Sequence, residues 1–181
     1  MYKIMLIFIL VFSTNAIAQT GGTKARKIIS VGFMALNSST TQGGVGPTGS
    51  SVLTRSEFVW AYNKFGFGAI FDYDLHGSNE KDSAHGIKVE AYLSNFYLEL
   101  GYLLSAKRAY TDRAIAEETG TGLVYGLGAR FSLKGASSGG PFFHASYKLK
   151  TQTLKKQDGI DLSEPIKQQD GYPVFGFGYS F

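Results

Sequence analysis

Apolar side chains recur at every second position in eight segments of the chain. The clearest is 65–76, where Phe65, Phe67 and Phe71 alternate with glycine, isoleucine and aspartate. A period of two is that of a β-strand whose two faces meet different surroundings. The pattern predicts strands at 27–36, 51–62, 65–76, 86–94, 96–105, 122–134, 142–153 and 172–181.

The connections between these segments alternate in length. Long polar stretches occupy 37–50, 77–85, 106–121 and 154–171, while short turns are expected at 63–64, at 95 and at 135–140. This alternation is typical of an outer-membrane barrel, with short periplasmic turns and longer external loops. The external loops of such a scaffold are candidate interaction surfaces. Their mixed charges, such as Lys107, Arg108, Glu117 and Glu118, do not indicate one ligand.

The two faces of the predicted strands differ in bulk. One face holds most of the large aromatic residues, and the other holds glycines and nearly all the strand charges. The interior of an eight-stranded barrel is just wide enough to be filled by side chains, so the bulky face must point outward. We therefore expect an all-β fold, an eight-stranded antiparallel up-and-down transmembrane β-barrel. The alternative is a soluble lipocalin-like barrel, in which the face with the large aromatic residues would have to line the cavity.

The inward face predicts a network of opposite charges in the lumen. Buried charges are tolerated when they are paired, and the acids and bases here are nearly balanced. We expect two layers, one with Glu90, Glu99 and Arg130, the other with Arg55, Asp72 and Lys88. The arrangement favours a salt-bridged plug, and a small passive channel is the alternative. The predicted lumen network is Arg55, Glu57, Asp72, Lys88, Glu90, Glu99 and Arg130, with Asp74, Lys134, Lys148 and Lys150 on the same face.

The first residues have the composition of a secretory signal peptide. Lys3 precedes a short apolar run, and Ala16-Ile17-Ala18 is a small-x-small cleavage site. We expect a signal peptide at 1–18 and one barrel domain at 19–181. The chain has no cysteine and a net charge of +4 without a basic run. A disulfide framework and a cysteine-ligated metal site are excluded, and the charge pattern does not predict a nucleic-acid partner.

The C-terminal residues Phe175, Phe177, Tyr179 and Phe181 alternate up to a terminal phenylalanine. This ending resembles the C-terminal signature of outer-membrane barrels, which implies recognition by the barrel-assembly machinery. The mature chain resembles the eight-stranded class that includes the OmpX/Ail, OmpW and OmpA-barrel families. The resemblance implies a non-enzymatic monomer in a Gram-negative outer membrane, with outer-membrane lipid and lipopolysaccharide as partners and a structural or surface-interaction role.

Three short motifs are candidate enzyme or metal sites. His144-Ala145-Ser146 resembles the His-x-Ser element of the lipid A deacylase (PagL-like) family, in which histidine is the base and serine the nucleophile. Tyr147 replaces that family's asparagine, and 172–181 offers no acid to orient His144. The G-x-S-x-G string at 135–139 is followed by Pro141 and a strand, so it predicts a turn. Asp72, Asp74 and His76 on one flat strand converge poorly, and no metal or other cofactor is expected.

Overall fold

The computed structural model describes residues 25–36, 40–42, 51–76, 80–111, 114, 116–133 and 139–181. The predicted signal peptide at 1–18, Lys134 and residues 135–138 of the G-x-S-x-G string lie outside this part of the chain, as does the side chain of His76.

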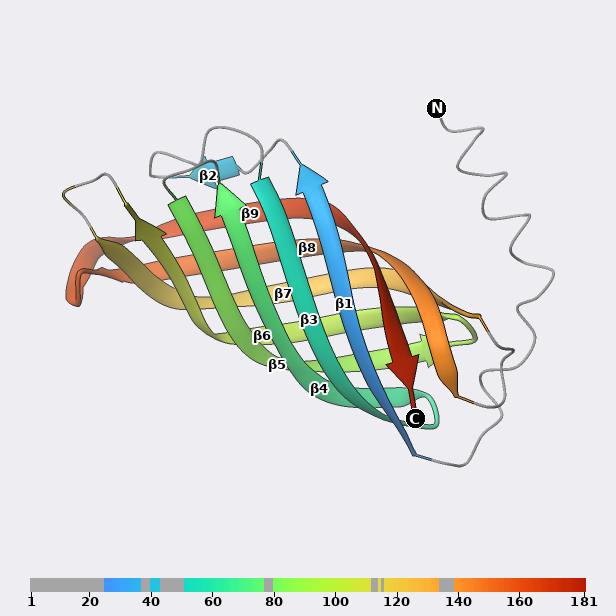
Figure 1. The fold of residues 1–181 in the computed structure, drawn as a ribbon. Coiled ribbons are helices and arrows are strands. Elements are labelled where there is room, and N and C mark those ends of the chain that lie inside the picture. The colour runs from blue at the N-terminus through green and yellow to red at the C-terminus, as the bar shows by residue number, and fades with distance from the viewer. Residues whose placement is uncertain are drawn as a thin grey trace.

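Eight antiparallel strands close into a ring (Figure 1). Neighbours along the chain pair with each other, and the ring closes where Ile28–Phe33 of the first strand pairs with 175–180 of the last. A short additional strand, β2 (Thr40–Gln42), pairs with the last strand beyond that closure. The eight are β1 (Arg26–Leu36), β3 (Ser51–Tyr62), β4 (Phe65–His76), β5 (Glu80–Leu93), β6 (Phe96–Tyr110), β7 (Glu117–Ser132), β8 (Gly140–Gln157) and β9 (Ile160–Ser180). The predicted fold class is confirmed.

The strands are longer on one side of the ring than the sequence predicted. β3 and β4 have their predicted bounds, but β5, β7 and β9 begin earlier, and β6 and β8 end later. The predicted loops 77–85, 106–121 and 154–171 are therefore wrong over most of their length. In these parts polar residues occur on both faces of the strand, and only single apolar residues such as Ala84, Ala106 and Leu154 face inward, so the apolar alternation disappears although backbone pairing continues. Figure 1 shows β7, β8 and β9 projecting past the other strands at the end away from the C-terminus.

The exterior of the ring carries a continuous apolar band. Trp60 is 62% exposed, Phe67 58% and Phe177 65%, whereas interleaved residues such as Arg55 and Lys88 are each 1% exposed. Outward apolar residues continue up to Leu75, Leu104 and Leu123. Above these, most outward positions of the projecting strands are polar, chiefly lysine, serine, threonine and glutamine, with acids such as Glu117 and Asp161 near the tips. Among the described residues, no helix is both long and apolar enough to cross a membrane.

The projecting strands are joined at their tips. β8 and β9 turn at Asp158 and Gly159, and both residues have positive φ. The Asp158 carboxylate accepts hydrogen bonds from the backbone N–H groups of Ala116 and Glu117, at 3.0 and 2.8 Å. These bonds fix the tip of the β8–β9 hairpin to the start of β7.

Candidate functional site

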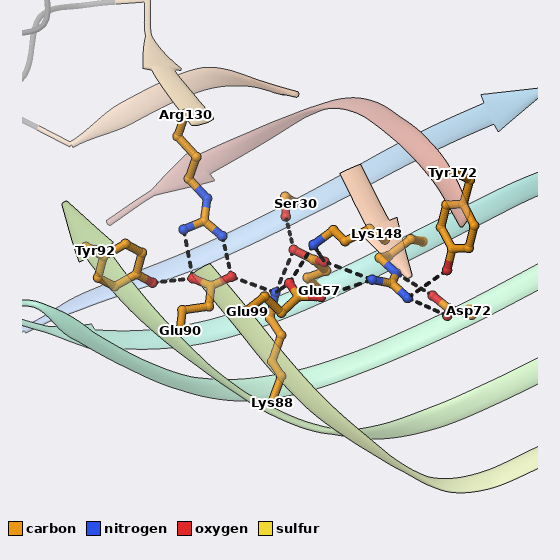
Figure 2. Close-up of polar contacts among 11 residues, drawn as sticks. Ser30, Glu57, Asp72, Lys88, Glu90, Tyr92, Glu99, Arg130, Lys148 and Tyr172 are labelled. Atoms are coloured by element: carbon orange, nitrogen blue, oxygen red, sulfur yellow. Dashed lines mark hydrogen bonds and ion pairs between the residues drawn. The ribbon is translucent and has the colours of Figure 1, made fainter. Parts of the chain in front are cut away.

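Eight ionic side chains from six strands meet inside the ring. They carry four positive and four negative charges, and each residue is at most 6% exposed. We call them the central network: Arg55, Glu57, Asp72, Lys88, Glu90, Glu99, Arg130 and Lys148. Figure 2 shows these side chains converging on one another across the lumen. All seven residues of the sequence-based network lie in it, together with Lys148.

Arg55 connects neighbouring and distant strands at one end of the network. Its guanidinium donates two hydrogen bonds of 2.6 Å to the Asp72 carboxylate on the adjacent strand β4. It also donates to Glu99 on β6 at 3.1 Å and to the Tyr172 hydroxyl on β9 at 3.2 Å. A planar guanidinium suits this position because it can donate to several acceptors at fixed angles.

Two lysines occupy the middle of the network. Lys88 Nζ lies 2.8 Å from Glu57, 2.7 Å from Glu90 and 3.0 Å from Glu99. Lys148 Nζ lies 2.5 Å from Glu99 and 3.5 Å from Glu57. The three glutamates have oxygens within 4.8 Å of one another, a spacing that would also suit a metal ion. Here Lys88 contacts all three, so ammonium groups supply the positive charge at this point.

Arg130 forms the end of the network nearest the short turns. Its two terminal nitrogens donate to the two Glu90 oxygens at 2.8 and 2.7 Å. The Tyr92 hydroxyl donates to the same carboxylate. The guanidinium carbon lies 4.2 Å from the centre of the Tyr97 ring, which places the cation against an aromatic surface. Glu90 is therefore held by Arg130, Lys88 and Tyr92.

The predicted layers differ from these contacts. Arg130 pairs with Glu90, whereas Glu99 belongs to Arg55, Lys88 and Lys148. Lys88 lies with the three glutamates rather than with Arg55 and Asp72. Long side chains cross the lumen, so residues at one height along neighbouring strands need not be partners.

Glycines make room for the network on the inner face of β7. A Cβ at Gly126 would lie 2.8 Å from Lys148 Cδ and 2.6 Å from the backbone oxygen of Tyr147. A Cβ at Gly128 would lie 2.6 Å from the Tyr97 ring. Larger residues here would displace Lys148 or Tyr97, so the glycines and the charges of the lumen depend on each other.

Buried apolar side chains share the lumen with the network. Near the short turns, Ile28, Val59, Ala61 and Phe142 form one buried cluster. A larger cluster is built around Ile70, Leu103 and Val124, each 0% exposed. The ions are therefore packed among apolar side chains.

The His-x-Ser pair lies in the lumen. His144 and Ser146 are alternate residues of β8 and are 2% and 8% exposed. Within the described part of the chain, neither His144 ring nitrogen nor the Ser146 oxygen makes a hydrogen bond. Two acids that follow the pair along the chain, Asp158 and Glu164, lie in the β8–β9 turn and in β9 far along the projecting hairpin. Among the described residues, no acid accepts a hydrogen bond from His144.

A second ionic group lies where the sequence predicted loops. Arg108 Nε is 2.9 Å from Glu80 and 3.1 Å from Asp82, and Arg108 Nη1 is 4.0 Å from Glu118. The Tyr110 hydroxyl donates to Glu118 at 3.0 Å. We call these five residues the outer cluster. Sequence reasoning missed it, although inward polar residues at every second position, Asp82 after Glu80 and Tyr110 after Arg108, were a usable signal.

Electrostatics in the outer cluster follow from burial and neighbouring charges. Burial raises the pKa of Tyr110 to about 12, and Glu118 adds to this increase while Arg108 opposes it. Burial alone would lower the pKa of Arg108, but Asp82 and Glu80 raise it above its ordinary value. Arg108 therefore stays charged and Tyr110 stays neutral at physiological pH.

The remaining predicted lumen residues also face inward. Asp74 is 5% exposed, and Lys150 is 1% exposed with its Nζ 5.9 Å from the centre of the Tyr172 ring. The C-terminal residues Phe175, Phe177 and Tyr179 lie on the exterior of β9, and Phe181 follows the strand.

Comparison with known proteins gives a likeness of fold. No family model matches the chain, and no curated protein matches it. The crystal structure of Neisserial surface protein A (NspA) aligns with a TM-score of 0.51 and 12% identity, covering 87% of this chain and 96% of NspA. The N-terminal β-barrel domain of Pseudomonas aeruginosa OprF aligns with a TM-score of 0.47 and 10% identity, covering 88% and 99%. The chain shares the eight-stranded antiparallel barrel architecture of NspA.

Proposed function

We propose that the protein is a non-enzymatic integral barrel of a bacterial outer membrane, with a structural or surface-interaction role. One observation carries the proposal: the polarity of the ring is inverted relative to a water-soluble barrel. Large apolar side chains cover the outside, and lysine, arginine and glutamate fill the inside. Only hydrocarbon makes such an exterior favourable, and a closed ring leaves no unpaired strand edge within lipid.

Aromatic residues support this placement at both boundaries of the band. Trp60, Tyr62 and Phe65 lie near the short turns, and all are more than half exposed. Tyr73 and Tyr102 are exposed near the opposite boundary. Girdles of aromatic side chains at the two interfaces are characteristic of transmembrane barrels.

The proposed orientation puts the short turns in the periplasm and the projecting parts of β5 to β9 outside the cell. The residues 1–18 would serve as a cleaved export signal. The alternating C-terminal residues up to Phe181 would be read by the barrel-assembly machinery. The projecting strands then form a rigid surface beyond the membrane, and this surface is the part available to partners.

A closed lumen argues against the channel alternative. The side chains of the central network are at most 7% exposed, and buried apolar clusters fill other parts of the lumen. We expect purified protein to give no conductance steps in planar bilayers. Regular single-channel steps that vanish on heat denaturation would instead favour the pore.

The geometry gives little support to the hydrolase alternative. His144 and Ser146 face the lumen, whereas a lipid substrate would approach from the exterior or from the rim. We expect Ser146→Ala to leave the acylation of lipid A unchanged in cells. A change in lipid A acylation that depends on Ser146 would replace the non-enzymatic proposal with the hydrolase.

A lysine placed on the exterior tests the membrane placement directly. Leu100, which is 56% exposed within the apolar band, is replaced by lysine. The matched control is Ser83→Lys, on the exposed outward face of a projecting strand. A lysine at mid-membrane costs roughly 2–4 kcal/mol in barrels, and much less outside it. Urea unfolding in phospholipid vesicles measures both variants. Equal stabilities for the two would contradict the proposed membrane band, as would recovery of the protein in the soluble fraction of cells.

A further inference from the structure

A polar patch covers the outward face of β7, β8 and β9 immediately above the apolar band. Its members are hydroxyl, amide and ammonium side chains at alternate positions of three neighbouring strands. We call it the threonine–lysine patch: Thr121, Thr151, Thr153, Lys155, Lys167 and Gln169. All six face away from the lumen, because Gln152 and Gln168 between them are buried.

The strand register brings these residues into rows across the sheet. Thr121 pairs with Thr153, and Thr153 pairs with Lys167. In the next row toward the membrane, Thr151 pairs with Gln169 on one side and with Leu123 on the other. Directly opposite residues have Cβ atoms about 4.5–5.5 Å apart, so each row is one contiguous surface. The row below, Tyr125 with Leu149, belongs to the apolar band.

The charge of this patch has one sign. Lys155 and Lys167 are both exposed, and no acid stands among the six residues. The outward acids of these strands lie nearer the tips, where Glu117 pairs with Lys107 and Asp161 with Lys156. Glu164 occupies the alternate face of β9. The ammonium groups of Lys155 and Lys167 therefore lie beside hydroxyl and amide groups at the edge of the apolar band.

The opposite wall of the barrel has no such patch. β3 begins at Ser51, β4 ends at His76, and their outward residues near that end are Val52, Tyr73 and Leu75. Among the described residues, the outward faces of β3 and β4 therefore carry no lysine or arginine above the apolar wall.

We propose that the threonine–lysine patch binds the phosphate of a phosphorylated glycolipid in the outer leaflet. The lysines would contact the phosphate, the threonines and Gln169 the sugar hydroxyls, and Leu123, Tyr125 and Leu149 the acyl chains. This inference rests on the proposed orientation in an outer membrane. Charge complementarity and continuity with the lipid-facing surface select this occupant over a soluble acidic protein, which would gain nothing from the apolar wall.

The experiment compares two double variants of the full barrel refolded in detergent micelles. Lys155→Gln/Lys167→Gln removes both patch cations, and Lys27→Gln/Lys64→Gln removes two lysines at the short-turn end. The probes are bisphosphorylated lipid A and the same lipid after removal of its phosphates, titrated by native mass spectrometry. A lysine near an anionic lipid surface contributes about 1 kcal/mol, so the patch variant should bind lipid A roughly 30-fold more weakly. The control should bind within about twofold of the parent, a difference of roughly 0.4 kcal/mol.

Four outcomes overturn the inference. They are an unchanged affinity in the patch variant, an equal loss in the control, equal binding of the dephosphorylated lipid by the parent protein, and no binding of lipid A by the folded parent protein. Heat-modifiable migration in gels verifies that each variant is a folded barrel before titration. If the parent barrel folds but does not bind lipid A, only the glycolipid site is refuted. If Leu100→Lys is as stable as Ser83→Lys in vesicles, the membrane placement itself is refuted.

Discussion

The central network and the outer cluster are two groups of buried ions in one continuous barrel, but their surroundings differ. The central network is balanced, lies behind the apolar exterior and is packed among buried apolar side chains. The outer cluster has one arginine against three acids and lies behind a polar exterior near the ends of the strands. Similar ion pairs therefore occur under two dielectric conditions in the same molecule.

This difference teaches that completeness of pairing matters most where water cannot enter. In a site without water, nothing replaces the lost partner of a buried charge, so the free-energy cost of burying that charge is no longer offset. Near the polar end, water and mobile ions can replace part of a lost interaction, so one pair contributes less. Equivalent substitutions in the two groups should therefore differ in size and in salt dependence.

The largest effect is expected for Glu99→Gln. Glu99 accepts hydrogen bonds from Arg55, Lys88 and Lys148, so neutralising it leaves an excess positive charge in the lumen. We expect a loss of about 3–5 kcal/mol in the free energy of unfolding. Urea titrations in micelles can follow Trp60, the one tryptophan of the chain. A loss below about 1 kcal/mol would show that the network rearranges or is hydrated.

Arg130→Ala should have the next largest effect. It removes both hydrogen bonds to Glu90, although Lys88 and Tyr92 remain as partners of that carboxylate. We expect a loss of about 3 kcal/mol by the same titration. Arg130→Lys keeps the positive charge but not the paired hydrogen-bond geometry, so its free energy of unfolding should lie between those of the parent protein and Arg130→Ala. If the lysine variant were no more stable than the alanine variant, the charge of Arg130 would not be what stabilises this end.

Arg108→Gln tests the other half of the comparison. It removes the cation shared by Glu80, Asp82 and Glu118, and we expect a loss of about 1–2 kcal/mol. Raising salt from low to molar concentration should shrink this difference, while the effect of Glu99→Gln should hardly change. A salt-independent loss as large as that of Glu99→Gln would mean that the two environments are alike.

Tyr110→Phe should have the smallest effect, visible only at alkaline pH. The pKa of Tyr110 is raised to about 12 in the folded protein, so the folded state holds this proton more tightly than the unfolded state. Its contribution is complete below about pH 10 and is lost as pH rises through about 12. The parent should therefore lose more stability than the phenylalanine variant across this range. Parallel pH profiles would show that Tyr110 is solvated.

The fold was largely predictable because alternation reports the faces of a strand. Strands such as β3 and β4 were bounded correctly because apolar side chains on one face and ions on the other give maximum contrast. The projecting parts of β6 and β9 were missed because polar residues occur on both of their faces, with only single apolar residues such as Ala106 and Ile166 facing inward. Alternation also identified which ions point inward, but not their partners: Glu57 on β3 and Lys148 on β8 meet across the lumen, at a distance that strand order alone does not specify.

The links across the lumen have a consequence for how the barrel forms. Arg55 and Glu57 on β3 have partners on β4 and β5, but each has a further partner on β6 or β8. In the proposed membrane, an open sheet of the first hairpins alone would therefore present an incomplete charge network to acyl chains. Insertion should therefore proceed as one cooperative closure, without long-lived half-inserted intermediates. The late strands, from β6 to β8, determine when the early ones can leave the aqueous phase.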